Sequence, residues 1–291
     1  QGPFTETWVG GNQHRHVEYL RGYNTIGAAI FEKNSAIVVD DHPLLTLSDG
    51  AGQDYSAAFS FWIKPNFSAG TGNNVVLAKR SPTTVIDREY MLYMGGQDIH
   101  LITYQGSPYD SYTYNTTGNV ISTSSNKWHH IVVNIAASAS PDSTVVSFYI
   151  DGVLVGSETE NDAGYTAMQD GTSDLIIGNL YLGSTAGLES ELRDLVIFNF
   201  QDQSSGLSQS DINHLLIGNV GRHPKVSSIV GWWKLYSNAL GYPSAGTESN
   251  ITYSSFDWLF PMDRPELYVT DEGVIKHPQE FISDYELARY T

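Results

Sequence analysis

The chain has 291 residues, of which 41% are hydrophobic and 12% aromatic, enough for the core of one large domain or two smaller ones. Its formal net charge is −17, from 32 acidic and 15 basic residues. A surface this acidic repels phosphate backbones and anionic lipids, so neither nucleic acid nor a membrane is expected as a partner. The absence of cysteine excludes disulfides, thiolate metal sites and cysteine nucleophiles.

The first 35 residues are polar and turn-rich, and we predict that they form an N-terminal docking segment. His14 and His16 would share one face of an extended chain, a spacing that can ligate a metal ion. Metal sites usually need further ligands nearby, so a hydrogen-bonding arm at an interface is the favoured interpretation. The chain begins with Gln1 rather than Met, which predicts a processed product or a fragment.

From residue 36 onwards, short runs of alternating or β-branched residues recur at roughly ten-residue spacing, separated by turns rich in Gly, Asn, Asp and Pro. This spacing is typical of a β-sandwich or barrel. Asp151-Gly152, between two such runs, predicts a two-residue type I′ hairpin turn because both positions need a positive φ. The predicted strands are residues 36–39, 44–47, 59–64, 75–79, 90–94, 99–104, 131–135, 145–150, 153–155, 175–182, 192–198 and 229–235.

One helix is predicted, at residues 208–216. Ser208 can cap its N-terminus with Asp211 at the N3 position, and Ile212, Leu215 and Leu216 form an apolar stripe. Residues 256–291 are charged and interrupted by prolines, and we predict that they form a C-terminal docking segment.

The order of several motifs resembles laminin-G-like, concanavalin A-like jelly-roll domains. These motifs are FSFWIKP (59–65), KWHHIVVNI (127–135), VSFYIDGVLVGS (146–157), LIIGN (175–179), LESELRDLVIFN (188–199) and LSQSDI (207–212). The resemblance implies an all-β, antiparallel β-sandwich with one short helix, which we assign to residues 36–255. IVGWWKL (229–235) is similar to the opening strand of such domains, and we hypothesise that it fills the same slot in a permuted order. In Trp128-His129-His130, one histidine is expected to hydrogen-bond a neighbouring strand.

The two ends are similar to paired segments of structural proteins encoded by marine tailed phages. The matching stretches are GPFTETWVGGNQHRH (2–16) and DRPE (263–266). This second resemblance implies that the jelly roll is inserted into a small split element of a virion protein.

One strand carries a possible catalytic motif, because glucanases of the same superfamily resemble E-x-D-x-x-E on one strand. Here the stretch reads Glu189, Glu191 and Asp194. Glu189 and Glu191 would share a face of the strand, whereas Asp194 would point to the other face unless a bulge intervenes. Retaining hydrolysis needs two carboxyl groups about 5–5.5 Å apart. The stretch aligns with the family's non-catalytic strand, so we predict that the protein is not an enzyme.

The loop from residue 105 to 119 is the predicted glycan-binding site. Sugar recognition needs a flat aromatic ring beside hydrogen-bonding side chains. The candidate residues are Tyr109, Asp110, Tyr112, Tyr114 and Asn115. The alternative is that these tyrosines cover a sheet edge or pack against a neighbouring subunit.

Calcium is the one candidate cofactor, because the family resemblance implies an ion held between loops. Asp162, Asp170 and Asp174 lie in one acidic loop, residues 158–174, and offer the oxygen donors that Ca²⁺ prefers. The alternative is that they are solvated turn residues.

These features together predict a non-catalytic, lectin-like structural or adhesion module. We expect it in a virion or another extracellular assembly, where it would decorate the surface or attach to glycans. Its expected partners are other copies of itself, other assembly proteins and surface glycans. The alternatives are a carbohydrate-binding module of a secreted glycan-active protein and a glycoside hydrolase.

Overall fold

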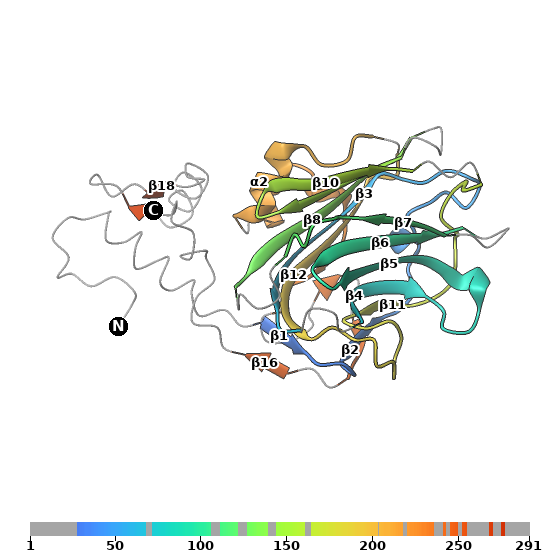
Figure 1. Ribbon diagram of the computed structural model, residues 1–291. Coiled ribbons are helices and arrows are strands. Elements are labelled where there is room, and N and C mark those ends of the chain that lie inside the picture. The colour runs from blue at the N-terminus through green and yellow to red at the C-terminus, as the bar shows by residue number, and fades with distance from the viewer. Residues whose placement is uncertain are drawn as a thin grey trace.

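The computed structural model describes residues 28–67, 72–105, 111–121, 127–138, 144–160, 164–202, 204–217 and 220–235. After these it describes only the backbone of residues 241–242, 245–249, 252–254, 268–269 and 275–276. The described residues form two large antiparallel sheets, one layered on the other, and one α-helix (Figure 1). The predicted all-β sandwich with a short helix is confirmed.

One sheet has nine strands. Across it run β10 (Val153–Thr159), β9 (Val145–Ile150), β8 (His129–Ala136), β3 (Ala57–Pro65), β12 (Ser190–Asn199), β1 (Ala28–Phe31) and β16 (Thr252–Ser254), while β13 (Ile229–Trp233) pairs with β12 and β14 (Gly241–Tyr242) with β13.

The other large sheet has seven strands. In order they are β15 (Ala245–Ser249), β2 (Ala36–Val39), β11 (Leu175–Ile177), β4 (Asn73–Arg80), β5 (Arg88–Gly95), β6 (Asp98–Tyr104) and β7 (Ser111–Asn115). The remaining elements are the β17 (Tyr268–Val269) and β18 (Ile275–Lys276) pair, and the 3-10 turns η1 (Pro43–Leu45), η2 (Val85–Asp87), η4 (Val220–Arg222) and η5 (Val226–Ser228).

The main core lies between the two large sheets, and period-two alternation places residues in it. On β3, Phe59, Phe61 and Ile63 are fully buried in this core, whereas Ser60 and Trp62 face the outer side of the sheet. The other sheet contributes inward residues of the same kind, which include Leu77, Leu92 and Leu101.

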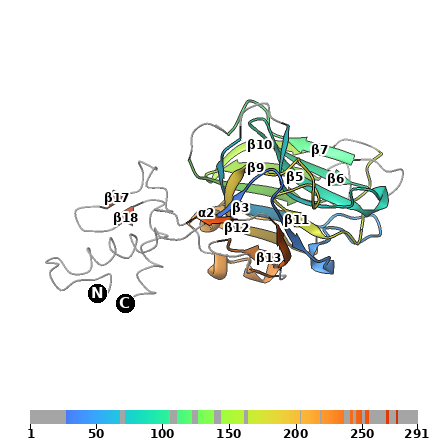
Figure 2. The same cartoon turned by 90° about the horizontal axis from the view of Figure 1, so that it is seen from below.

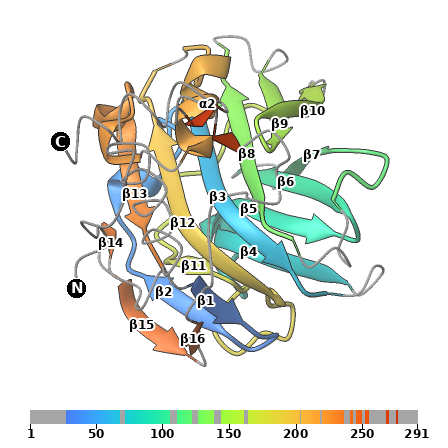
Figure 3. The same ribbon diagram turned by 90° about the vertical axis from the view of Figure 1, so that its left-hand side faces the viewer.

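Two strands share one edge of β12. β1 pairs with Ser190–Leu192, and β13 pairs with Leu195–Phe198. Asp194 lies between these stretches in a β-bulge with φ 48°, and its N–H donates to the carbonyl of Lys234 (3.0 Å). Figure 3 shows β1 and β13 one after the other along β12. β13, which carries most of IVGWWKL, therefore pairs with β12, and its assignment to the opening-strand slot of the family stays a hypothesis.

The chain enters and leaves the sandwich at the same place. Ala28, at the start of β1, pairs with Ser254, at the end of β16. β1 lies within residues 1–35, so the sheet begins before the predicted boundary at residue 36. The assignment of residues 1–35 and 256–291 as docking segments remains a prediction, because most of these residues, His14 and His16 included, lie outside the described ones.

The predicted helix is α2 (Gln209–Leu216), and it covers part of the outer face of the nine-stranded sheet. Ser208 and Asp211 form a capping box, as the sequence predicted. The helix packs Ile212 and Leu215 against residues of the sheet such as Val132 and Phe198. Figures 1 and 2 show α2 on the side of the sandwich away from β5, β6 and β7. In the described part of the chain, no helix is long and apolar enough to cross a membrane.

Two predicted strands differ from the structure. Residues 43–45 form a 3-10 turn because Pro43 starts it and the side chain of His42 caps it, so residues 44–47 are not a strand. The strand predicted at residues 175–182 ends at Ile177, because Gly178 adopts φ +82° and turns the chain. A Cβ at Gly178 would lie 2.0 Å from the ring of Phe31. The predicted Asp151-Gly152 turn is confirmed, with φ values of 53° and 80°.

Candidate functional site

Three of the five residues predicted to bind a glycan lie on β7, the edge strand of the seven-stranded sheet. Tyr114 pairs with Leu101 and Tyr112 with Thr103, so both tyrosines lie on the face that meets the other sheet. Tyr114 is 1% exposed, and burial raises the pKa of its hydroxyl well above the usual range. Its ring cannot stack on a ligand from this position, so Tyr114 is a core residue rather than a ligand contact.

Tyr112 and Asn115 hold this edge against β10 of the other sheet. The half-buried Tyr112 donates its hydroxyl to the carbonyl of Thr159 (3.3 Å). The backbone N–H of Asn115 donates to Oε2 of Glu158 (2.7 Å). These contacts match the alternative in which the tyrosines cover a sheet edge. Tyr109 and Asp110 lie outside the described residues.

The acidic loop is exposed at two of its three predicted calcium ligands, Asp170 and Asp174. Oδ1 of Asp174 accepts the backbone N–H of Asp41 (3.1 Å). Asp162 lies outside the described residues, and among those described no group of three or more His, Cys, Asp or Glu could hold a metal ion. The calcium site therefore stays a prediction.

Hydrogen bonds connect the stretch predicted to bind a glycan with the acidic loop predicted to bind calcium. Oε1 of the buried Gln105 accepts the backbone N–H of Thr166 (2.6 Å), and its Nε2 donates to the carbonyl of Gly164 (3.0 Å). The N–H of Gln169 donates to the carbonyl of Tyr104 (2.8 Å). The end of β6 and the acidic loop are thus bound together at one end of the sandwich.

A buried carboxylate ties a third segment to the same end. Oδ1 of Asp54 accepts the N–H of Met168 (2.6 Å), and its Oδ2 accepts the hydroxyl of Tyr165 (3.2 Å). Burial raises the pKa of Asp54 to about 7, although both hydrogen bonds oppose the rise. Because this carboxyl is 6% exposed and satisfied by the protein, it holds the loop in place rather than meeting a ligand.

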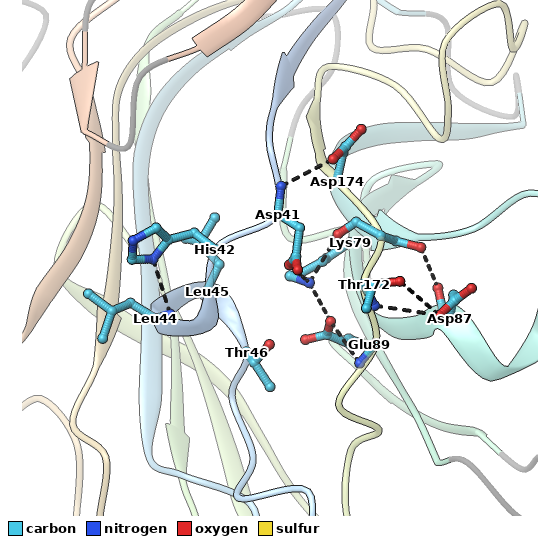
Figure 4. Close-up of polar contacts among 12 residues, drawn as sticks. Asp41, His42, Leu44, Leu45, Thr46, Lys79, Asp87, Glu89, Thr172 and Asp174 are labelled. Carbon is cyan, nitrogen blue, oxygen red and sulfur yellow. Dashed lines mark hydrogen bonds and ion pairs between the residues drawn. The ribbon is translucent and has the colours of Figure 1, made fainter.

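A second buried network anchors the acidic loop to β4 and β5 (Figure 4). Lys79 is fully buried, and its Nζ contacts Glu89, Oδ1 of Asp41 (2.7 Å) and the carbonyl of Ser173 (3.0 Å). Burial raises the pKa of Glu89 to about 7, and the ion pair with Lys79 opposes the rise. All these donors and acceptors belong to the protein, so the network supports the fold.

The carboxylates of the possible catalytic motif each face a cation. Glu189 lies 3.8 Å from Lys33, Glu191 is 3.0 Å from Lys64, and Asp194 is 2.8 Å from Arg193. The sequence did not decide whether a bulge interrupts the strand, and the structure has one at Asp194. The Asp194 side chain is nevertheless only 5% exposed and forms an ion pair with Arg193. The strand therefore does not present a free pair of carboxyl groups.

The outer face of the seven-stranded sheet carries a patch of apolar and aromatic side chains that the helix does not cover. Val75, Ala78 and Met91 form its buried floor, and four partly exposed side chains pack on them. We call these four residues, Tyr93, Ile102, Tyr104 and Leu180, the outer platform. Flat aromatic rings and apolar side chains on an open sheet face are the surface against which the CH face of a sugar can pack.

Polar groups flank both ends of the outer platform. The ring of His100 stacks on Tyr93, with centroids 4.6 Å apart and planes within 9°. Burial lowers the pKa of His100, which favours the neutral form of this ring. At the other end, Nη1 of Arg80 donates to the hydroxyl of Tyr104 (2.9 Å), and the guanidinium lies 5.2 Å from the ring centroid.

The sequence contained the alternation that builds this platform. His100, Ile102 and Tyr104 alternate with Ile99, Leu101 and Thr103 along β6, which places the two sets on opposite faces. Whether either face is covered depends on contacts with the second sheet and the helix, and a local sequence pattern does not predict those contacts. The prediction that one histidine of Trp128-His129-His130 bonds to a neighbouring strand is confirmed, since Nε2 of His130 lies 3.0 Å from the hydroxyl of Ser60 on β3.

The chain is similar to several solved structures. A protein from Bacteroides ovatus ATCC 8483, provisionally described as carbohydrate binding, superposes with a TM-score of 0.55 at 15% identity, over 81% of this chain and 62% of that one. The binding domain of Paraclostridial Mosquitocidal Protein 1 gives a TM-score of 0.45 at 17% identity, over 65% and 42% of the two chains. A heptameric SAP-like pentraxin from Limulus polyphemus gives 0.46 at 12% identity, over 80% and 96%.

The chain thus spans less than two thirds of the first two of these proteins, and at such identities the likeness shows the fold alone. No curated protein sequence matches the chain. A family model described as the Concanavalin A-like lectin/glucanases superfamily matches residues 34–205, which is more than half of the chain. This match covers the motifs from FSFWIKP to LESELRDLVIFN and the strands that they form, and on this ground the chain belongs to the Concanavalin A-like lectin/glucanases superfamily.

Proposed function

We propose that this chain is a non-catalytic carbohydrate-binding module that packs sugar rings on the outer platform. The observation that carries the proposal is the pair of tyrosines, Tyr93 and Tyr104, on a sheet face that α2 leaves open. Membership of a lectin and glucanase superfamily supports it. The ion-paired state of Glu189, Glu191 and Asp194 supports binding without hydrolysis.

The test is a binding screen with neutral polysaccharides, for example laminarin, xylan and dextran, by affinity electrophoresis and calorimetry. Tyr93→Ala and Tyr104→Ala should each weaken binding about tenfold, which corresponds to about 1.4 kcal/mol. Tyr149→Ala is a matched control, because Tyr149 is a half-buried tyrosine on the outer face of the other sheet. Tyr112→Ala tests the site expected from the sequence. Loss of binding in Tyr112→Ala alone would move the site to β7, and release of reducing sugar would overturn the non-catalytic proposal.

We further propose that the module serves adhesion or surface decoration in a virion or another extracellular assembly. The resemblance of the two ends to paired segments of phage structural proteins supports this setting. So does the pairing of Ala28 with Ser254, because an inserted domain must receive and return the chain at one place. Light scattering should give the mass of a multimer for the whole chain. After proteolysis of the two ends, it should give an assembly with fewer copies. A monomer in both states would contradict the proposal.

A further inference from the structure

Two arginines lie side by side at the end of the outer face that bears Tyr104. Arg80 on β4 and Arg88 on β5 are directly opposite each other in the register of the strands. Like charges in directly opposed positions destabilise a sheet. Both side chains are half-buried, which reduces the screening of their repulsion by water.

No carboxylate compensates for this repulsion within the described residues. Three other lysine or arginine side chains lie on the described strands of the two large sheets, namely Lys64, Lys79 and Arg193. Each of them pairs with a carboxylate at 3.0 Å or less. Arg80 and Arg88 have no such partner there, although acidic residues outnumber basic ones by 32 to 15 in the chain.

The two guanidinium groups also have hydrogen-bonding capacity that the described protein does not use. Nε of each arginine is shielded from solvent and has no hydrogen-bond partner among the residues that the structure describes. Arg80 uses Nη1 for the hydroxyl of Tyr104 (2.9 Å), and this contact holds its guanidinium beside the aromatic ring. A guanidinium carries five N–H donors in a planar fork that matches the oxygens of a carboxylate or sulfate.

We infer that Arg80 and Arg88 form an oxyanion subsite that binds a carboxylate or sulfate group of a sugar packed on Tyr104. This inference rests on the proposed function and narrows its ligand to acidic glycans. One bound oxyanion would lie between two like charges and relieve their repulsion, and its oxygens would accept charge-assisted hydrogen bonds. We assign the negative charge to the ligand, because the described residues of the sheet face supply only cations at this point.

The experiment compares charged and neutral forms of the same polymer at 0.15 M salt. At this ionic strength, charges on the rest of the acidic surface are screened beyond about 8 Å. The probe pairs are dextran sulfate with dextran, and polygalacturonate with its methyl ester. The chain should bind at least one charged member ten or more times tighter than its neutral partner. The pair that shows the preference distinguishes sulfate from carboxylate.

Single-residue variants then show which arginine side chain causes the preference for the charged polymer. Arg88→Gln should remove it, and should not lower the melting temperature, because one of the two repelling charges is gone. Arg88→Lys should retain only part of it, since the planar fork is lost. Lys225→Gln removes the same charge from an exposed position after α2 and should leave the preference unchanged.

The inference fails if charged and neutral polymers bind equally, or if Arg88→Gln keeps the preference. It also fails if Lys225→Gln and Arg88→Gln weaken binding of the charged polymers to the same extent, since that result indicates non-specific attraction. Neutral binding that depends on Tyr93 and Tyr104, without any preference for charge, would overturn the oxyanion subsite and leave the proposed function standing. Binding that is insensitive to both tyrosines would overturn the proposed function itself.

Discussion

Replacement of Asp54 by asparagine should remove the pH dependence that this buried carboxyl imposes on stability. Burial raises its pKa from 3.8 to about 7 in the folded protein. The folded state then binds a proton more tightly than the unfolded state, so the contribution of this group to stability is highest below pH 4 and is lost as the pH rises towards 7. At about 1.36 kcal/mol per pKa unit, Asp54 lowers the unfolding free energy by up to about 4 kcal/mol between these limits.

The asparagine side chain in the Asp54→Asn variant would keep the local hydrogen bonds. Its Oδ1 can still accept the N–H of Met168, and its Nδ2 can donate to the hydroxyl of Tyr165, which can accept as well as donate. Relative to the wild type, Asp54→Asn should therefore gain up to about 4 kcal/mol of unfolding free energy between pH 4 and pH 8. Glu89 also has a raised pKa, but it is present in both proteins, so its contribution cancels.

Urea denaturation at pH 4, 6 and 8, followed by fluorescence of the six tryptophans, measures this difference. Asp49→Asn is the matched control, because Asp49 lies in the same loop with its pKa lowered by the N–H groups of Gln53 and Ala51. Its ionised form stabilises the loop, so Asp49→Asn should be slightly less stable than the wild type by the same amount at pH 6 and 8. If the stability difference between Asp54→Asn and the wild type is the same at every pH, burial does not destabilise the ionised carboxylate.

Three further predictions concern the scaffold. Gly178→Ala should lower the melting temperature sharply or prevent folding, because its Cβ would meet the ring of Phe31; an unchanged calorimetric transition would contradict this. Asp211→Ala removes half of the capping box and should cost about 1 kcal/mol in urea denaturation, and a cost near zero would show that packing alone holds α2. Lys79→Met should cost about 3–5 kcal/mol because it leaves Glu89 buried without its cation. The double variant Lys79→Met, Glu89→Gln should recover part of this cost, and a cycle without coupling would refute the ion pair.

The candidate site was only partly predictable from the sequence. The prediction of Tyr112, Tyr114 and Asn115 as ligand contacts rests on their side-chain chemistry, which does not reveal the direction of a side chain. On β7 both tyrosines face the core, and only the partner strand β6 shows this, through the pairing of Tyr114 with Leu101. The sequence does not distinguish Tyr93 and Tyr104 from core residues, because each lies in a strand that also carries many apolar side chains.

The juxtaposition of Arg80 and Arg88 is harder still to predict from the sequence. The two residues are separated by a turn, η2, and by a shift of register near Glu89. A change of one residue in this register would place one arginine on the opposite face. Their contact is therefore a property of strand pairing.

The sequence by itself determined the class of fold, because alternation, turn residues and the capping box act over a few neighbouring positions. It placed the strand at residues 59–64, the Asp151-Gly152 turn and the start of α2. Tertiary structure alone decided which sheet face α2 leaves open, and how Gln105 and Asp54 bring three loops together. Those features arise from contacts between residues distant in sequence, and their geometry depends on how the two sheets pack and not on any local pattern.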